Sequence, residues 1–293
     1  MKETLCREHR HPAESFLLAA VYGVASASVA LLLGIIGYVF VKGAPAVDRE
    51  FLTSVTSALK QTTGIAGNLA NTLYMVVMTL LAAAPVGVGA AIYMSEYARP
   101  GRLTDLIEFT VAALSGIPSI LYGLFGMAFF GDVFHLGHSL LRGALTLTLM
   151  VLPLIIQNTR EALRAVPESY RKAALGMGAS RWHMIRTVLL PTAVPGIMTG
   201  MILAVGRIVG ESAALLLTAG SGRFLPGQGG SLAECLEAVG ARALESGGTL
   251  AAELYLQMQN GRYDAAFGIG CVLILIILCL NMLLRIGKAR PSL

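Results

Sequence analysis

Charged residues are scarce in this chain: they make up 13% of its 293 residues, whereas a soluble domain carries about a quarter. The hydrophobic fraction is 55% and the mean hydropathy is +0.70. So few charges cannot solvate so much apolar surface, which excludes a soluble globular domain and an intrinsically disordered chain. We therefore expect the chain to lie in a lipid bilayer.

Cysteine is also scarce, and it occurs without a recognisable spacing. The four cysteines form neither a CxxC pair nor a Cys/His ligand pattern, so we expect no disulfide framework and no metal site: Cys6, Cys235, Cys271 and Cys279. The sequence also lacks GxxxxGK[ST], the loop whose backbone N–H groups bind nucleotide phosphates. We expect no cofactor, and any ATP hydrolysis must come from another chain.

Six apolar segments approach the length of roughly 20 residues that spans a bilayer as a helix. They lie near 16–41, 69–94, 106–131, 140–157, 192–219 and 265–285. The first is too long for the apolar core of a signal peptide and shows no small-residue cleavage pattern, so we expect it to be retained. The fourth is the least secure prediction, because it is short and bounded by Arg142 and Gln157.

The basic residues predict the orientation. An N-terminus in the cytoplasm puts most of them inside: Lys2, Arg7, Arg10, Arg99, Arg102, Arg160, Arg164, Arg171, Lys172, Arg181, Arg186, Arg285, Lys288 and Arg290. Outside are Lys42, Arg49, Lys60, Arg223, Arg242 and Arg262. This asymmetry favours an all-α, multi-pass protein of the cell inner (plasma) membrane with both termini cytoplasmic, residues 1–15 forming the N-terminal tail.

Three connections are long enough to have a function. Residues 42–68 and 220–264 form outer loops, and an amphipathic helix is expected around 232–244 in the second. This second loop either contacts an outside protein or covers the pore as a solvated cap. Within the third span, Ser115 to Ser119 is the best candidate for a helix break, because Pro118 removes a backbone donor and obstructs the preceding turn.

Two charges lie inside the fifth span. Arg207 and Glu211 are four residues apart, which places them on one face of a continuous helix. Each is costly in lipid, so the pair predicts either a substrate pathway or an internal ion pair that locks the fold. An arginine held by Glu211 presents fixed donors to an oxyanion and still releases it. The GxxxG pairs Gly196/Gly200 and Gly206/Gly210 predict close packing against a partner helix.

The inner loop, residues 158–191, is basic, and its proline and glycine residues predict where short helices begin and end. Pro167 can begin a short helix over 168–176, and Gly176 and Gly178 then form a tight turn. A second helix is expected from Ala179 to near Pro191. A helix–turn–helix of this kind suits a groove on a cytoplasmic partner, although a basic amphipathic segment also fits anionic lipid headgroups.

This loop resembles the EAA motif of permeases of ATP-binding cassette (ABC) importers. The motif residues keep the family spacing: Lys172, Ala173, Ala174, Gly178, Val188, Leu189, Leu190 and Pro191. Lys172 stands where the motif usually has glutamate. The resemblance implies six transmembrane helices of the type I importer permease kind over residues 16–293. It also implies that loop 158–191 is the segment that couples to the ATPase.

A narrower resemblance, to the PstA family of phosphate importer permeases, rests on five stretches. They are residues 91–98 (AIYMSEYA), 116–126 (GIPSILYGLFG), 161–167 (EALRAVP), 196–200 (GIMTG) and 207–213 (RIVGESA). It implies a pore shared with a PstC-like sister permease, a PstB-like ATPase dimer and an external PstS-like phosphate-binding protein. The substrate pathway that it implies contains Arg207, Glu211 and Ser212.

The chain departs from this family at several positions. Gln157 replaces an expected arginine, Arg160 an acid, Ser212 a threonine and Ala214 a proline. Loss of a second basic group weakens the argument for phosphate selection, so another oxyanion (phosphonate, molybdate or sulfate) stays open. So does an ion-coupled secondary transporter or channel that uses Arg207 and Glu211 as a relay. A membrane enzyme acting on lipid is disfavoured, because His135 and His138 lack a third ligand.

Overall fold

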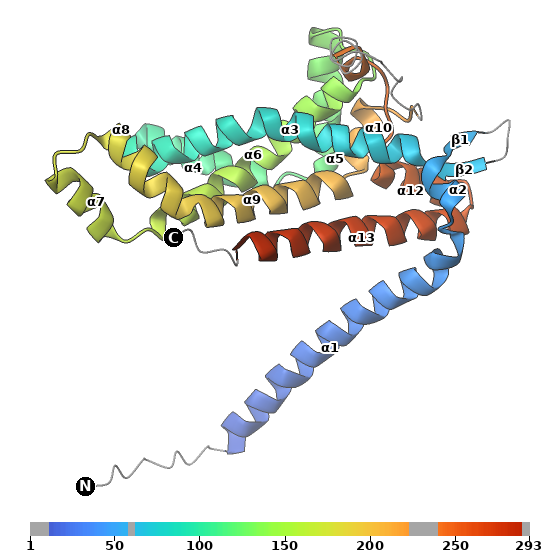
Figure 1. Ribbon diagram of the computed structural model, residues 1–293, viewed down its shortest axis with the longest axis horizontal. Helices are drawn as coiled ribbons and strands as arrows, with labels where there is room; N and C mark the ends of the chain where they lie inside the picture. Colours follow the sequence, from blue (N-terminus) through green and yellow to red (C-terminus); the bar gives the residue numbers. More distant parts are fainter. Residues whose placement is uncertain (1–11, 58–61, 223–239, 289–293) are drawn as a thin grey trace.

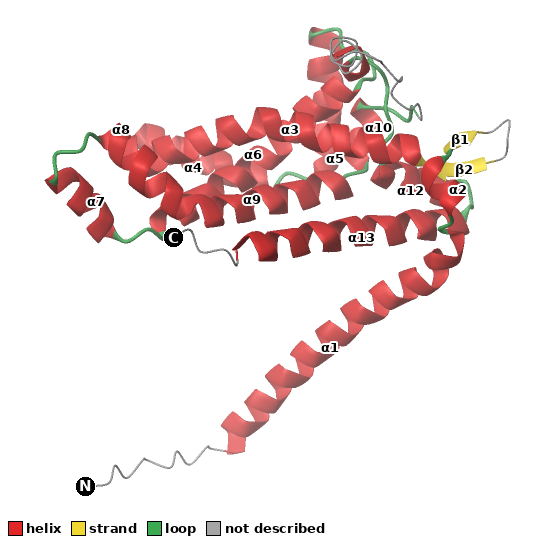
Figure 2. Ribbon diagram, viewed as in Figure 1, coloured by secondary structure: helices red, strands yellow, loops and turns green. Residues whose placement is uncertain are grey.

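The computed structural model describes residues 12–57, 62–222 and 240–288, and most of them are helical (Figures 1 and 2). The first half contains α1 (Pro12–Gly43), the 3-10 helix η1 (Ala44–Ala46), α2 (Arg49–Thr53), β1 (Val55–Ser57), β2 (Thr62–Ile65), α3 (Ala66–Ile92), the π-helix η2 (Tyr93–Tyr97), α4 (Arg102–Ser115), α5 (Ser119–Gly126) and the π-helix η3 (Met127–Val133). The second half contains α6 (Leu140–Arg164), α7 (Glu168–Gly176), α8 (Arg181–Met184), the π-helix η4 (Ile185–Leu189), α9 (Leu190–Gly210), α10 (Ala213–Thr218), α12 (Leu250–Gln259) and α13 (Tyr263–Lys288).

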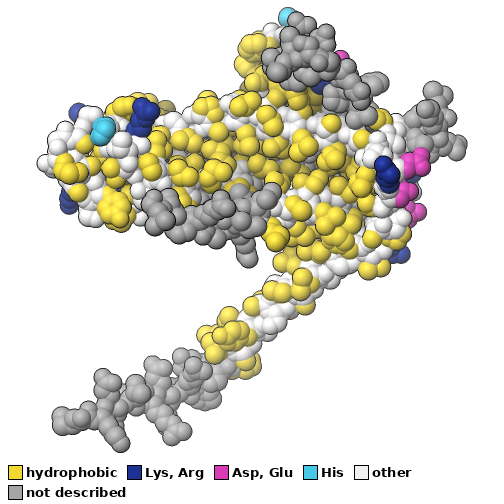
Figure 3. Space-filling view, viewed as in Figure 1, with side chains coloured by type: hydrophobic (Ala, Val, Ile, Leu, Met, Phe, Trp, Pro, Cys, Tyr) yellow, Lys and Arg dark blue, Asp and Glu magenta, His cyan; other side chains and the backbone are white. Residues whose placement is uncertain are grey.

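The predicted spans fall on these helices. Within the described residues, five helices are long and apolar enough to cross a membrane, and a sixth span results if α4 and α5–η3 are counted as one bent pair. Figure 3 shows hydrophobic side chains over the middle of the bundle and charged ones at its two ends. The all-α membrane fold is therefore confirmed, while the orientation of the termini stays a prediction.

Helix α6 is the centre of the bundle, contrary to the prediction that the fourth span is the least secure. It is 25 residues long, and 67% of its most apolar stretch is buried, against 33% or less in the other single-helix spans. The core cluster joins α6 to α3, α9 and α10 through Met75, Leu147, Val151, Ile208 and Leu215. Arg142 and Gln157 lie inside this helix instead of bounding it, because the fold supplies partners for the buried Arg142.

One of the two GxxxG pairs packs within the chain. A Cβ added at Gly196 would lie 2.5 Å from the Cβ of Ala162, and one at Gly200 would lie 2.6 Å from the Cβ of Asn158, both on α6. Added Cβ atoms at Gly206 and Gly210 meet nothing within 4 Å. The predicted close packing is thus present between α9 and α6, and the second pair faces open space.

Helix α1 departs from the other helices (Figure 1). None of its most apolar stretch is buried, and it contacts α13 near its C-terminal end, where the rings of Tyr38 and Phe267 meet edge to face at 5.7 Å. The following loop forms a short antiparallel hairpin, β1 with β2, in the register Val55 opposite Ile65. The apolar pattern alone did not predict this hairpin.

Two predicted elements differ in the structure, and a third is largely untested. The helix expected to stop near Pro191 begins at Arg181 and continues through Gly210; Pro191 lies just after the π-helix η4, and a local π adjustment of this kind lets a membrane helix continue past a proline. The fifth span is interrupted after Gly210. The amphipathic helix expected at 232–244 lies largely outside the described residues.

Candidate functional site

The third span is broken where Pro118 predicted. Helices α4 and α5 meet at an angle of 103°, and the loop between them runs from Gly116 to Pro118. The Tyr122 hydroxyl of α5 donates a hydrogen bond of 2.7 Å to the Leu114 carbonyl in the last turn of α4. The last carbonyl groups of a helix have no partner within that helix, and in lipid they must be hydrogen-bonded by other parts of the protein. Here α5 supplies such a hydrogen bond to the end of α4.

The fifth span is broken beside it. Helix α9 ends at Gly210, Glu211 is extended (φ −80°, ψ 124°), and the short helix α10 starts at Ala213. Helix α10 lies against α5 closely enough that a Cβ at Gly123 would come within 2.8 Å of the Cα of Ala214. Two interrupted spans therefore pack against each other next to their breaks. Interrupted spans of this kind are tolerated where they face protein or a water-filled pathway.

Glu211 forms no ion pair with Arg207 among the described residues, so the internal ion pair, one of the two predicted alternatives, is not seen there. Glu211 is the C-cap of α9, one turn after Arg207, and the chain leaves the helix directly after it. The buried Glu211 instead caps α10, accepting a hydrogen bond of 3.1 Å from the backbone N–H of Ala214. A carboxylate is favourable at this position because it faces the positive end of the helix dipole.

The capping role predicts how Glu211 substitutions behave. Glu211→Ala removes the acceptor, and we expect it to destabilise the protein by about 0.5–2 kcal/mol, the usual cost of losing a cap. Glu211→Gln keeps a side-chain oxygen for the Ala214 N–H and should stay close to wild type. Thermal melting of the two purified variants in the same detergent measures the difference. Equal melting temperatures for the two variants would contradict the capping role.

Arg207 is exposed on the bundle surface, within the last turn of α9. Among the described residues no carboxylate forms an ion pair with it. Its neighbours Gly206 and Gly210 add no side chains, so the guanidinium stands on an open face. Ser212, which precedes α10, is half-buried, and its hydroxyl makes no capping bond to that helix. Arg207 and Ser212 thus remain available to a ligand, whereas Glu211 is occupied.

Arg142, which the sequence placed at a span boundary, holds the other end of α10. It is 4% exposed and donates bonds of 2.8 Å to the carbonyls of Leu217 and Thr218. It also donates to Leu136 and contacts the His138 Nδ1 at 2.8 Å. A cation at the C-terminus and a carboxylate at the N-terminus both complement the dipole of α10. No residue pattern indicated that Arg142 would contact α10, because the two are about 75 residues apart along the chain.

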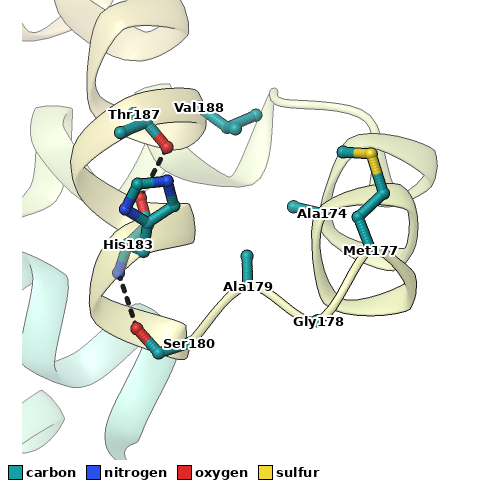
Figure 4. Close-up of a pocket in the computed structure, with 8 residues that line it drawn as sticks. All are labelled: Ala174, Met177, Gly178, Ala179, Ser180, His183, Thr187 and Val188. Carbon is teal, nitrogen blue, oxygen red and sulfur yellow. Dashed lines mark hydrogen bonds between the residues drawn. The ribbon is translucent and has the colours of Figure 1, made fainter.

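The predicted coupling segment forms at the end of the bundle that carries α7 and α8 (Figure 1). Pro167 precedes α7, which covers the predicted residues 168–176, and Gly178 makes the turn with φ +84°. Lys172, Ala173 and Pro191 are exposed, Leu190 is half-buried, and Ala174 is buried against the following helix. Figure 4 shows Ala174 and Met177 facing Thr187 and Val188 across a pocket of about 510 Å³.

Two ion pairs at this end involve residues that the sequence had not paired. Arg171 of α7 binds Glu96 of η2 at 3.1 Å. Arg160 of α6 pairs with Glu108 of α4, which accounts for a basic residue where the family pattern has an acid. Gln157 is half-buried in α6. Both ion pairs join segments far apart in sequence, so residue spacing gave no signal for them.

Broken spans, an exposed intramembrane arginine and a cytoplasmic-type helix–turn–helix define the class: a multi-pass transport subunit of the ABC importer permease fold. Residues 83–290 match the family described as "Binding-protein-dependent transport system inner membrane component", and the chain belongs to that family. It is therefore a non-catalytic inner-membrane subunit, which functions together with an ATPase and a substrate-binding protein.

Several relatives are similar over most of the same region. The chain is 40% identical over 205 residues to the probable ABC transporter permease protein YqgI of Bacillus subtilis, covering 70% of each chain. It is 37% identical to the phosphate transport system permease protein PstA of Xylella fastidiosa, covering 61% of this chain and 62% of that protein. For PstA of Haemophilus influenzae the identity is 36%, with 63% and 65% covered.

Solved structures show the same fold at low identity. The chain matches a bacterial alginate ABC transporter, solved with an alginate-bound periplasmic protein, with a TM-score of 0.66 at 15% identity over 95% of both chains. It matches the inward-facing MetNI methionine ABC transporter with a TM-score of 0.54 at 22% identity, over 77% of this chain and 94% of that one. These likenesses confirm the importer permease architecture.

Proposed function

We propose that the chain is the permease subunit of an ATP-driven inorganic phosphate importer and forms half of its translocation pore. The PstA proteins of Xylella fastidiosa and Haemophilus influenzae, both phosphate transport permeases by name, support the choice of substrate. The partners that we propose are a PstC-like sister permease, a PstB-like ATPase dimer and a PstS-like phosphate-binding protein outside the cell. ATP binds to the ATPase subunits, and the permease itself carries no cofactor.

The observation that carries the proposal is Arg207 inside the fifth span, which is exposed and has no ion-pair partner among the described residues. A charge at the centre of a membrane helix costs roughly 2.5–3.5 kcal/mol on insertion scales when it faces lipid. The face that bears Arg207 must therefore line a water-filled pathway or meet another protein. Its guanidinium offers several fixed donors, which suit the oxygens of a tetrahedral anion.

The coupling segment supports the ATP-driven part of the proposal. Helix α7, with Lys172 and Ala173 exposed and Gly178 at its turn, lies at one end of the bundle (Figure 1). A segment of this shape fits a groove on an ATPase subunit. Closure of the ATPase dimer then moves α7 and the helices joined to it, which changes the side of the membrane to which the pore opens.

Uptake of radiolabelled phosphate tests the proposal. We expect proteoliposomes that hold the chain with its partners to accumulate phosphate only with ATP enclosed, and unlabelled phosphate to compete far better than sulfate, molybdate or phosphonate. Uptake that continues without the ATPase and collapses with an uncoupler would instead identify an ion-coupled transporter. Transport of another oxyanion in place of phosphate would keep the architecture and overturn the substrate.

A further inference from the structure

Helix α3 is tied to the rest of the protein by polar side chains at both of its ends. It is 27 residues long and continues directly into η2. Figure 1 shows it running from the end of the bundle near α2 and the β-hairpin to the end near α8. Between the two ends it packs on α6, where Ile155 lies against Gly87, and Met75, Ala83 and Ala91 are buried.

The inner tie joins η2 to the coupling segment. The Glu96 carboxylate accepts a bond of 3.1 Å from Arg171 of α7, and the two side chains are 8% and 15% exposed. Arg171 also donates to the carbonyls of Leu163 and Val166, at 2.8 and 2.9 Å. A carboxylate in the last turn of a helix opposes the helix dipole, so Glu96 is not placed there to stabilise its own helix. The Glu96 carboxylate instead binds α7, which we call the coupling helix.

The outer tie joins α3 to the second outer loop. Asn71 donates to the carbonyls of Gly222 and Gly248 at 3.2 and 3.1 Å, and its side-chain oxygen accepts a bond of 2.8 Å from Arg242. One turn of α3 also binds the start of α12, because the backbone N–H of Leu250 donates to the Thr72 hydroxyl at 2.9 Å. Asn71 and Thr72 are almost fully buried, with 2% and 3% of their surface exposed.

These ties are costly to break. A buried polar group that loses its partner costs about 1–3 kcal/mol, and more if it is charged. Residues 242–250 are therefore expected to move with the Asn71 end of α3, and α7 is expected to move with the Glu96 end. Because the body of α3 is close-packed on α6, a displacement at one end is passed along the helix and is not absorbed within it.

We propose that the substrate-binding protein acts on residues 242–250, the described end of the second outer loop, and that α3 carries this signal to α7, the coupling helix on which the ATPase acts. Thr72 and Glu96 are the positioning residues at its two ends. The inference rests on the proposed division of labour between a binding protein outside and an ATPase inside. It does not depend on which oxyanion is carried.

The first test measures ATP hydrolysis by the assembled transporter in lipid nanodiscs, with and without the substrate-loaded binding protein. Glu96→Gln and Thr72→Val should keep basal hydrolysis within about twofold of wild type and lose at least about fivefold of the stimulation, the lower end of typical coupling between sites. Glu168→Gln is the matched control, because Glu168 is 65% exposed and contacts the same Arg171 at 3.5 Å without reaching α3. Thr72→Ser should restore the stimulation.

Full stimulation in both Glu96→Gln and Thr72→Val would overturn the proposal. A wild-type complex that the binding protein does not stimulate would count against the proposed function, and a second measurement then decides the inference.

In a cysteine-free background, spin labels at Met177→Cys in α7 and Tyr97→Cys in η2 report their separation with and without trapped ATP. We expect this distance to stay constant in the wild type and to change on trapping when Glu96→Gln is added. A change as large in the wild type would show that α7 and α3 move independently.

Discussion

Arg207→Gln should reduce ATP-driven phosphate uptake by roughly ten- to a hundredfold. Glutamine keeps a polar side chain of similar reach but removes the positive charge, and a hydrogen bond to a charged group is worth about 1.5–3 kcal/mol. Because Arg207 is exposed and has no ion-pair partner among the described residues, its loss leaves no buried carboxylate unpaired. We therefore expect assembly and melting temperature to stay close to wild type.

Radiolabelled uptake into proteoliposomes, normalised to the assembled complex, measures this effect. Arg49→Gln is the matched control, because Arg49 is also exposed but lies in α2, outside the spans. Glu211→Gln is the more informative comparison. If Arg207 and Glu211 worked as a pair, both substitutions would reduce phosphate uptake to a similar extent. Uptake that survives Arg207→Gln would make Arg207 structural and place the pathway elsewhere in the bundle.

Gly178→Pro should abolish transport while the protein still inserts and assembles in the membrane. Gly178 has φ +84°, whereas the proline ring fixes φ near −65°, so the turn between α7 and α8 cannot form as it is. The substitution also removes the N–H that donates to the Leu175 carbonyl at 3.0 Å. Without this turn, α7 no longer points from the bundle in a fixed direction, and movement of the ATPase is not transmitted.

The control for this change lies two residues earlier. Gly176 is the last residue of α7, has no positive φ, and a Cβ added there would meet nothing within 4 Å. Gly176→Ala should therefore transport normally, while Gly178→Pro shows at most background uptake at the same level of assembled complex. Normal uptake by Gly178→Pro would mean that coupling does not require a rigid turn.

The features of this protein that its sequence predicts correctly are local ones. Sequence alone determined the membrane environment, the apolar helices, the break at Pro118, the bounds of α7 and the turn at Gly178, because composition, apolar run length and Pro/Gly chemistry act over a few neighbouring residues. It also selected Arg207, since a charge within an apolar run is costly wherever the helix packs.

Tertiary structure alone decided which of these residues meet. Spacing placed Glu211 one turn from Arg207 and left an ion pair open, but in the folded chain the Glu211 carboxylate accepts the backbone N–H of Ala214 in α10. The partners of Arg142 and Arg171 lie on other helices, and a helical period fixes the face of a residue without naming the helix that the face meets. The site therefore depends on contacts between segments distant in sequence, which only the folded bundle defines.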